Sequence, residues 1–172
     1  TTLKSILNYF PGDELKAKVM QRIHDFEDTM QYRMFPGVSE FLTALKAAGI
    51  PTAIVTSSDE VKMSYLYKQL PVLRDMVDEV IDASMVTRSQ PDPQGYLLAA
   101  KKLGCRPEDC YVFEDSLQGI EAGRRAGATV IGIATTNPAD TVRPLCDYLL
   151  PSFIGFTPAS LLEIKKQIRP SL

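Results

Sequence analysis

The chain has 172 residues, of which 45% are hydrophobic and 23% charged. These proportions are typical of one globular domain, with or without a small appendage, and exclude a disordered or fibrous protein. Nineteen basic against 21 acidic side chains leave a net charge of −2, so no basic surface for a nucleic acid is expected. The sequence has three cysteines but no Cys-x-x-Cys pair, and it shows neither a signal-peptide pattern nor an apolar run of membrane length. These features favour a cytoplasmic protein without a membrane partner.

The first third of the chain has apolar residues at helical spacing. Residues 3–10 and 15–30 predict two amphipathic helices, separated by Pro11-Gly12. The apolar stripe of the second helix has five members: Leu15, Val19, Ile23, Phe26 and Met30. A third helix is expected to open at Pro36-Gly37 and to end at Gly49.

From residue 50 onward, short apolar runs alternate with helical patterns. Strands are expected at 52–55, 80–81, 110–113, 129–133 and 148–150. Helices are expected at 61–70, 93–103 and 116–126, with a last one around 161–168. Strands that alternate with helices at this spacing predict an α/β fold built on a mostly parallel, doubly wound sheet.

Polar residues follow two of these strands at the carboxyl end, where open parallel sheets bind ligands. After the first strand, Thr56, Ser57 and Ser58 offer hydroxyls and successive backbone N–H groups ahead of a helix, which is an arrangement suited to an anion. The alternative is that these hydroxyls only cap the helix.

Two adjacent acids, Glu114 and Asp115, follow the strand at 110–113. Neighbouring strand residues point to opposite faces, so both carboxylates reach one cation only if the chain already turns at Asp115. Ser116, which is expected to open the next helix, favours that turn. Paired carboxylates of this kind suit Mg²⁺. The alternative is that Asp115 merely caps the helix.

A third segment is the proline-bracketed loop Ser89-Gln90-Pro91-Asp92-Pro93. Together with this loop, the two sites resemble the haloacid dehalogenase superfamily, in its β-phosphoglucomutase-like, sugar-phosphatase branch with a helical cap. The matching strings are Phe35-Pro36-Gly37-Val38, Leu45-Lys46-Ala47-Ala48-Gly49, Ile54-Val55-Thr56-Ser57-Ser58, Pro91-Asp92-Pro93, Val112-Phe113-Glu114-Asp115-Ser116, Gly119-Ile120-Glu121-Ala122-Gly123 and Ala126-Gly127. The resemblance implies a Rossmannoid three-layer α/β/α fold with a parallel sheet, in which residues 1–34 are the remnant of the α-helical cap and residues 35–172 the core without its first strand.

The resemblance also implies a function, which is phosphoryl transfer from a small phosphorylated metabolite such as a sugar phosphate. An Asp attacks the phosphate, and water or a second hydroxyl then takes the phosphoryl group. Thr56 and the Ser57 N–H would bind the phosphate, and Glu114 and Asp115 would hold Mg²⁺. A phosphate-binding lysine is expected where this chain has Gln90.

Two features depart from the family pattern. The chain contains no two Asp residues spaced i, i+2, so the family's Asp-x-Asp nucleophile and acid–base are both absent. Gln90 can donate a hydrogen bond but carries no positive charge. The neighbouring Arg88 could compensate, although a solvated loop cation is the favoured interpretation.

Three explanations stay open. The preferred one is that the chain is an N-terminally truncated form of an enzyme. The second is a natural pseudoenzyme that binds a phosphorylated ligand or a protein partner, and the third an unrelated α/β binding domain. Because the family's first strand is central in the sheet, we expect its neighbours to pair directly or to accept a strand from a second copy, by a strand swap or in a dimer. The single histidine, His24, is expected to be a surface or packing residue rather than a ligand.

Overall fold

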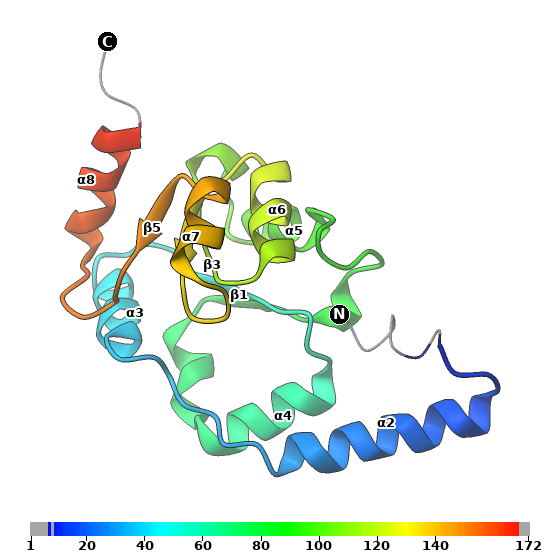
Figure 1. Ribbon diagram of the computed structural model, residues 1–172. Coiled ribbons are helices and arrows are strands. Elements are labelled where there is room, and N and C mark those ends of the chain that lie inside the picture. The colour runs from blue at the N-terminus through cyan, green and yellow to red at the C-terminus, as the bar shows by residue number, and fades with distance from the viewer. Residues whose placement is uncertain (1–6, 8, 169–172) are drawn as a thin grey trace.

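The computed structural model describes residue 7 and residues 9–168 (Figure 1). The helix expected at 3–10 therefore lies mostly outside the described residues. The α-helices are α2 (Asp13–Asp28), α3 (Val38–Ala47), α4 (Glu60–Gln69), α5 (Gln94–Lys102), α6 (Leu117–Arg125), α7 (Ala139–Val142) and α8 (Pro158–Ile168). The strands are β1 (Ala53–Val55), β2 (Glu79–Ile81), β3 (Tyr111–Glu114), β4 (Thr129–Ile133) and β5 (Tyr148–Leu150).

All five strands lie where the sequence predicts them, and every pair is parallel. The sequence pattern did not reveal the 3₁₀ helices at Pro71–Met76, Ala83–Met85, Pro107–Asp109 and Arg143–Leu145, nor the four-residue α7. Such short elements bury too few residues to leave a periodic signal.

The strands form two sheets rather than the single sheet expected. One has the order β1-β2 and the other β3-β4-β5. Direct pairing of β1 with β3, one of the two alternatives expected, is therefore wrong among the described strands. Two strands form a ladder only where their backbones lie within hydrogen-bonding distance along their length. No such ladder joins β1 to β3 in the described part of the chain. Pairing with a strand from a second copy stays a prediction.

Helices cover both faces of the three-stranded sheet, which gives three layers. On one face, α3 and α8 pack over β4 and β5 through a cluster of buried residues: Phe41, Leu45, Ile131, Leu150, Leu161 and Ile164. On the other face, α6 and α7 pack over β3 and β4 through Val112, Ile120, Val130 and Val142. Alternate residues of β3 and β4 thus point into opposite cores, as expected for a sheet buried on both sides.

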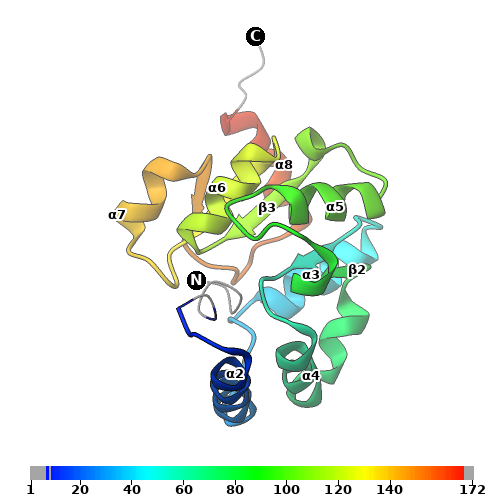
Figure 2. The same cartoon turned by 90° about the vertical axis from the view of Figure 1, so that its right-hand side faces the viewer.

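Helix α2 lies outside these layers, beside α4 (Figures 1 and 2). None of its residues is buried, and Phe26, a member of the predicted apolar stripe, is 67% exposed. The stripe is therefore not a core face within the described chain. The division of the chain into a cap at 1–34 and a core at 35–172 stays a prediction.

Because the strands of each sheet are parallel, their carboxyl ends lie together at one edge of that sheet. Thr56 follows β1, Asp115 follows β3, and Thr135 lies just beyond β4. The fold thus places polar residues from several separate segments at strand ends, and these residues define the candidate site.

Candidate active site

The turn after β1 holds Thr56 by its backbone and by its side chain. The Thr56 N–H donates to the carbonyl of Ile81 at 2.9 Å, which continues the β1–β2 ladder. The Thr56 Oγ1 accepts from the Ser58 N–H at 3.1 Å. Since the hydroxyl accepts this bond, its proton is left to donate to another group, such as a phosphate oxygen.

The helix-capping interpretation of Thr56 and Ser57 is wrong. The N-cap of α4 is Asp59, whose Oδ1 accepts from the Lys62 N–H at 2.9 Å. An Asp at this position satisfies one of the free N–H groups at the start of the helix. Thr56 and Ser57 therefore precede the cap and are not needed for it.

Gln90 shares a pocket with Thr56 and Ser57. The pocket is lined by residues at and after the ends of β1 and β2, by the segment 86–92 and by the first turn of α5: Val55, Thr56, Ser57, Ile81, Asp82, Ala83, Val86, Arg88, Ser89, Gln90, Asp92 and Gly95. The structure thus brings together the three residues predicted to bind phosphate. The peptide bond between Gln90 and Pro91 is cis.

Arg88 lines the same pocket. Its guanidinium Nε lies 3.1 Å from the Asp92 Oδ2, and its side chain is 70% exposed. An exposed cation paired with its own loop matches the interpretation favoured from the sequence. Arg88 nevertheless lines the pocket together with Gln90, and it carries a positive charge two residues before Gln90 in the sequence.

Glu114 is held by neutral hydrogen-bond donors. Its Oε1 accepts from the phenol of Tyr96, and its Oε2 accepts from the Ser116 hydroxyl at 3.0 Å and the Ser116 N–H at 3.2 Å. Burial, followed by the negative charge of Glu114, raises the pKa of Tyr96 far above its usual value. Tyr96 therefore stays protonated and remains a donor. Tyr96 in turn accepts from the Gln90 amide at 3.3 Å, so the phosphate and metal candidates are linked.

Gly119 is required for this position of Glu114. A Cβ built on Gly119 would overlap the Glu114 carboxylate itself, from its carbon to both oxygens. Only a residue without a side chain therefore lets the carboxylate fold over the first turn of α6.

Asp115 is held by the loop after β4. Its Oδ2 accepts from the hydroxyls of Thr135, at 2.8 Å, and Thr136, and its backbone carbonyl accepts from the Asn137 amide at 2.9 Å. The N-cap of α6 is Ser116, which accepts from the Gly119 N–H at 3.0 Å. The capping interpretation of Asp115 is therefore wrong as well.

The two acids lack a counter-ion among the residues that the structure describes: neither Glu114 nor Asp115 takes part in an ion pair there. Adjacent carboxylates held only by neutral donors repel each other unless a cation joins them. Hard oxygen donors of this kind fit Mg²⁺. The donor set therefore agrees with the metal that the family resemblance implies.

Sequence reasoning missed Tyr96, Thr135, Thr136 and Asn137. Tyr96 falls within the helix predicted at 93–103, and its hydroxyl gave no separate signal. The other three come shortly after β4, at the same sheet edge as Asp115, so the rule that ligands bind at strand ends could have found them.

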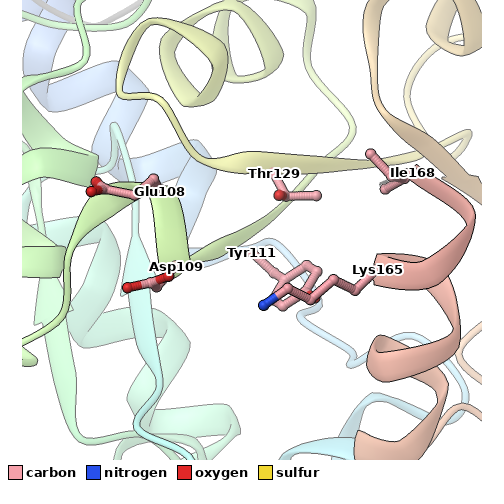
Figure 3. A pocket seen from close by; sticks show the side chains of 6 residues that line it. All are labelled: Glu108, Asp109, Tyr111, Thr129, Lys165 and Ile168. Carbon is pink, nitrogen blue, oxygen red and sulfur yellow. The ribbon is translucent and has the colours of Figure 1, made fainter. Parts of the chain in front are cut away.

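A second pocket lies at the opposite ends of the strands (Figure 3). Tyr111 and Thr129, which begin β3 and β4, line it together with Glu108, Asp109, Lys165 and Ile168. None of the predicted site residues is among them. This pocket therefore does not belong to the candidate active site.

Comparison with known proteins points to one family. Residues 3–127 match the model of the haloacid dehalogenase-like hydrolases. Hexitol phosphatase A of Escherichia coli is 39% identical over 110 residues, which are 63% of this chain and 48% of that protein. The chain thus spans about half the length of this relative.

Solved structures agree with the match. A hydrolase of the same superfamily from Entamoeba histolytica (family IA, variant 3) has a TM-score of 0.80 and 27% identity, over 95% of this chain and 77% of that one. A β-phosphoglucomutase from Clostridium difficile has a TM-score of 0.75 at 19% identity, over 91% and 69% of the two chains, which supports the fold alone. The three-layer α/β fold expected from the sequence is confirmed. Among the described residues, no helix has the length and apolar character needed to cross a membrane.

Proposed function

The chain belongs to the haloacid dehalogenase-like hydrolase family, and from this premise we propose that its site serves Mg²⁺-dependent phosphoryl transfer from a small phosphorylated metabolite, such as a sugar phosphate. The observation that carries the proposal is the carboxylate pair Glu114 and Asp115, which has no counter-ion among the described residues and is linked through Tyr96 to the pocket of Gln90 and Thr56. The similarity to a hexitol phosphatase favours a phosphate monoester as substrate.

Thr56, Ser57 and Gln90 would bind the phosphate group. The Thr56 hydroxyl and the Gln90 amide can each donate one hydrogen bond, and the Ser57 N–H adds a backbone donor at the same turn. Their common pocket supports this assignment. Arg88, at the rim of that pocket, would supply a positive charge only by leaving Asp92.

Glu114 and Asp115 would hold Mg²⁺, which when bound offsets the negative charge of the phosphate. Tyr96 and Ser116 orient Glu114, while Thr135 and Thr136 orient Asp115. Because these four donors are neutral, they fix both carboxylates without cancelling the charge that the cation needs.

We propose further that these 172 residues are catalytically incomplete. They contain no Asp-x-Asp sequence, which the family resemblance requires for the nucleophile and the acid–base. Phosphate and metal binding would then belong to this chain and bond cleavage to residues outside it. The share of the relatives' length that the chain spans supports this division of roles.

Calorimetric titration with inorganic phosphate, with and without Mg²⁺, tests the binding role. We expect phosphate affinity to rise when Mg²⁺ is present, and this rise to be lost in Asp115→Asn. Asp75→Asn, an exposed acid that lines neither of the two pockets, is the matched control and should keep it. Equal phosphate binding by wild type and Asp115→Asn would reject the proposed site.

Turnover of an aryl phosphate tests the incompleteness. We expect no Mg²⁺-dependent hydrolysis by the chain. Robust hydrolysis that disappears in Asp115→Asn would show that the chain has a nucleophile of its own.

A natural pseudoenzyme is the second candidate, and Gln90 favours it because a neutral amide replaces the expected lysine. The coding sequence upstream of residue 1 separates the two candidates. An Asp-x-Asp-Gly after an apolar strand there would support the enzyme, and its absence would support the pseudoenzyme.

We also propose association of the isolated chain with a second copy, by strand exchange or dimerisation. β1 and β3 each have one hydrogen-bonded neighbour among the described strands, so each presents an edge that another strand can join. Light scattering after size exclusion should then give a mass above that of one chain, increasing with concentration.

We also propose a cytoplasmic location for the protein, since all three cysteines are free.

A further inference from the structure

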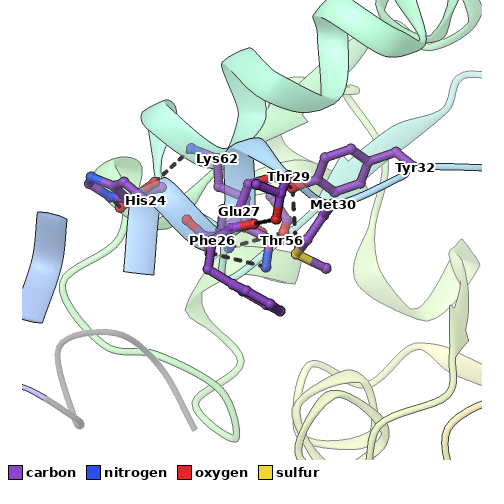
Figure 4. A network of polar contacts seen from close by, with 10 residues as sticks. His24, Phe26, Glu27, Thr29, Met30, Tyr32, Thr56 and Lys62 are labelled. Carbon is purple, nitrogen blue, oxygen red and sulfur yellow. Dashed lines mark hydrogen bonds and ion pairs between the residues drawn. The ribbon is translucent and has the colours of Figure 1, made fainter. Parts of the chain in front are cut away.

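A cluster of three potential metal ligands lies where α2 meets α4, outside the site described above. His24 and Glu27 come from α2, and Asp59 is the N-cap of α4. One ligand atom from each lies within 4.8 Å of the other two. Figure 4 shows His24 and Glu27 in the polar network between the helices, together with Lys62. His24 thus lies beside two further potential ligands, whereas the sequence favours a surface or packing role for it.

The geometry of the cluster suits a small borderline cation. The spacing i, i+3 places His24 and Glu27 on one face of α2. The distance from His24 Nε2 to Asp59 Oδ2 is 3.3 Å, and two donors bound tetrahedrally to Zn²⁺ at their usual bond lengths are about 3.3 Å apart. Asp59 is held in place because its other oxygen caps α4 at 2.9 Å.

Glu27 supplies an independent observation that points to a ligand at the cluster. Its side chain is only 13% exposed. Its Oε2 is buried without a hydrogen-bond partner, and it is the one such side-chain atom within the described residues. A buried carboxylate oxygen without a partner is costly, and a bound cation is one of the few groups that can satisfy it.

Lys62 occupies part of this space. Its Nζ lies 3.3 Å from the Glu27 Oε1, with 32% of its side chain exposed. A lysine ammonium and a metal ion compete for the same carboxylate, and the long lysine side chain can turn toward solvent. Lys62 therefore weakens metal binding without blocking it.

We propose that His24, Glu27 and Asp59 form a Zn²⁺ site that joins α2 to α4. One imidazole nitrogen and two carboxylate oxygens give three protein ligands, and water completes the tetrahedron. Mg²⁺ is a poor occupant because it prefers oxygen ligands in an octahedron. Asp59 lies three residues beyond Thr56 along the chain, so the ion would fix α2 close to the turn that is the candidate phosphate site.

Calorimetric titration of the tag-free full chain with Zn²⁺ tests the proposal. We expect saturable binding of one ion, weakened by about 100-fold or more in His24→Gln and in Glu27→Gln, since losing even an outer-shell partner often costs 10–100-fold. Glu14→Gln, an exposed acid on the same helix, should bind as the wild type does. Asp59→Asn keeps the cap, because Asn caps as well as Asp, and should weaken binding similarly.

Lys62→Met tests the proposal in the opposite direction, and so separates it from a loss of fold. Removing the competing charge should tighten Zn²⁺ binding by about tenfold. Lys18→Met removes an exposed lysine of α2 that pairs with Glu14 and should have no effect. Zn²⁺ should also raise the melting temperature of wild type and Lys62→Met, but not of His24→Gln.

Two further variants locate the bound ion. Binding should persist with Cys105 and Cys110 both replaced by Ser, and in Asp115→Asn. Loss of binding in either would place the ion elsewhere and overturn the proposal. So would absence of Zn²⁺ binding, an unchanged affinity in Glu27→Gln, or weaker binding by Lys62→Met.

Discussion

The molecule holds pairs of acids in two contrasting ways. At the end of β3, Glu114 and Asp115 are surrounded by neutral donors and have no cation among the described residues. Between α2 and α4, Glu27 and Asp59 already face Lys62 and His24. The first arrangement leaves its negative charge without a cation among the described residues, whereas in the second Lys62 offsets part of the charge and joins the two helices. Acidic residues are therefore held by neutral donors in one place and by basic side chains in the other.

The largest effect should come from Gly119→Ala. The added Cβ would overlap the Glu114 carboxylate, so the carboxylate or α6 must move. We expect a loss of stability of about 1–3 kcal/mol, as for overpacked cores, and loss of Mg²⁺-dependent phosphate binding. Urea unfolding and calorimetry measure the two. Gln118→Ala, at the exposed neighbouring position of α6, is the control. An unchanged Mg²⁺ response in Gly119→Ala would mean that the position of Glu114 is unimportant.

Tyr96→Phe should have the next largest effect, because it removes the donor that holds Glu114. We expect a loss of about 1–3 kcal/mol in the free energy of unfolding, the usual cost of leaving a buried acceptor without its partner. Urea denaturation measures it, with Tyr9→Phe, at an exposed position, as control. A loss below that of the control would show that Ser116 alone suffices to hold Glu114.

The same tyrosine makes stability depend on alkaline pH. Burial raises the pKa of Tyr96 in the folded state above the value of 10.0 for a free tyrosine, so the folded protein holds this proton more tightly than the unfolded chain. The contribution is complete below pH 10 and is lost as the pH rises toward the folded pKa. Wild type should therefore lose stability faster than Tyr96→Phe above pH 10. Parallel alkaline curves for the two proteins would contradict the raised pKa.

Asp115→Asn should give a smaller change of opposite sign. The amide can still accept from Thr135 and Thr136, while repulsion from Glu114 disappears. Without metal, we expect a gain in stability of about 0.5 kcal/mol, near the size of like-charge effects between neighbouring side chains. Asp59→Asn, by contrast, loses its pairing with His24 and should be neutral or destabilising. Thermal unfolding of both variants in a metal chelator makes the comparison, and equal shifts would remove the distinction between the two regions.

The smallest effect expected is that of salt on α2. The ion pair of Lys62 with Glu27, which joins α2 to α4, is partly exposed, and such pairs contribute about 0–1 kcal/mol and weaken as salt rises. Hydrogen exchange of α2 amides should therefore speed up in high salt, while that of β4, which lies in the buried sheet, stays the same. Equal responses would mean that ion pairs do not hold α2.

Periodicity and turn residues in the sequence were enough to predict the strands and most helices, because a buried strand or an amphipathic helix imposes its own spacing. They also singled out Thr56, Ser57, Glu114 and Asp115 as candidates, since these lie at the end of a strand or directly after it. The sequence could not decide whether Thr56 caps α4 and Asp115 caps α6. Asp59 and Ser116 are equally good caps by residue type, and only the hydrogen bonds show that these two are the caps.

The sequence by itself therefore determined the family, the α/β class and the order of the candidate phosphate and metal motifs, all of which depend on residues close together in the chain. The tertiary structure alone decided the rest: the division into two sheets, the bond from Tyr96 to Glu114, the threonines around Asp115, and the meeting of His24 and Glu27 with Asp59. These contacts join segments 18 to 35 residues apart. Their formation depends on how helices and sheets pack, which no local pattern of residues records.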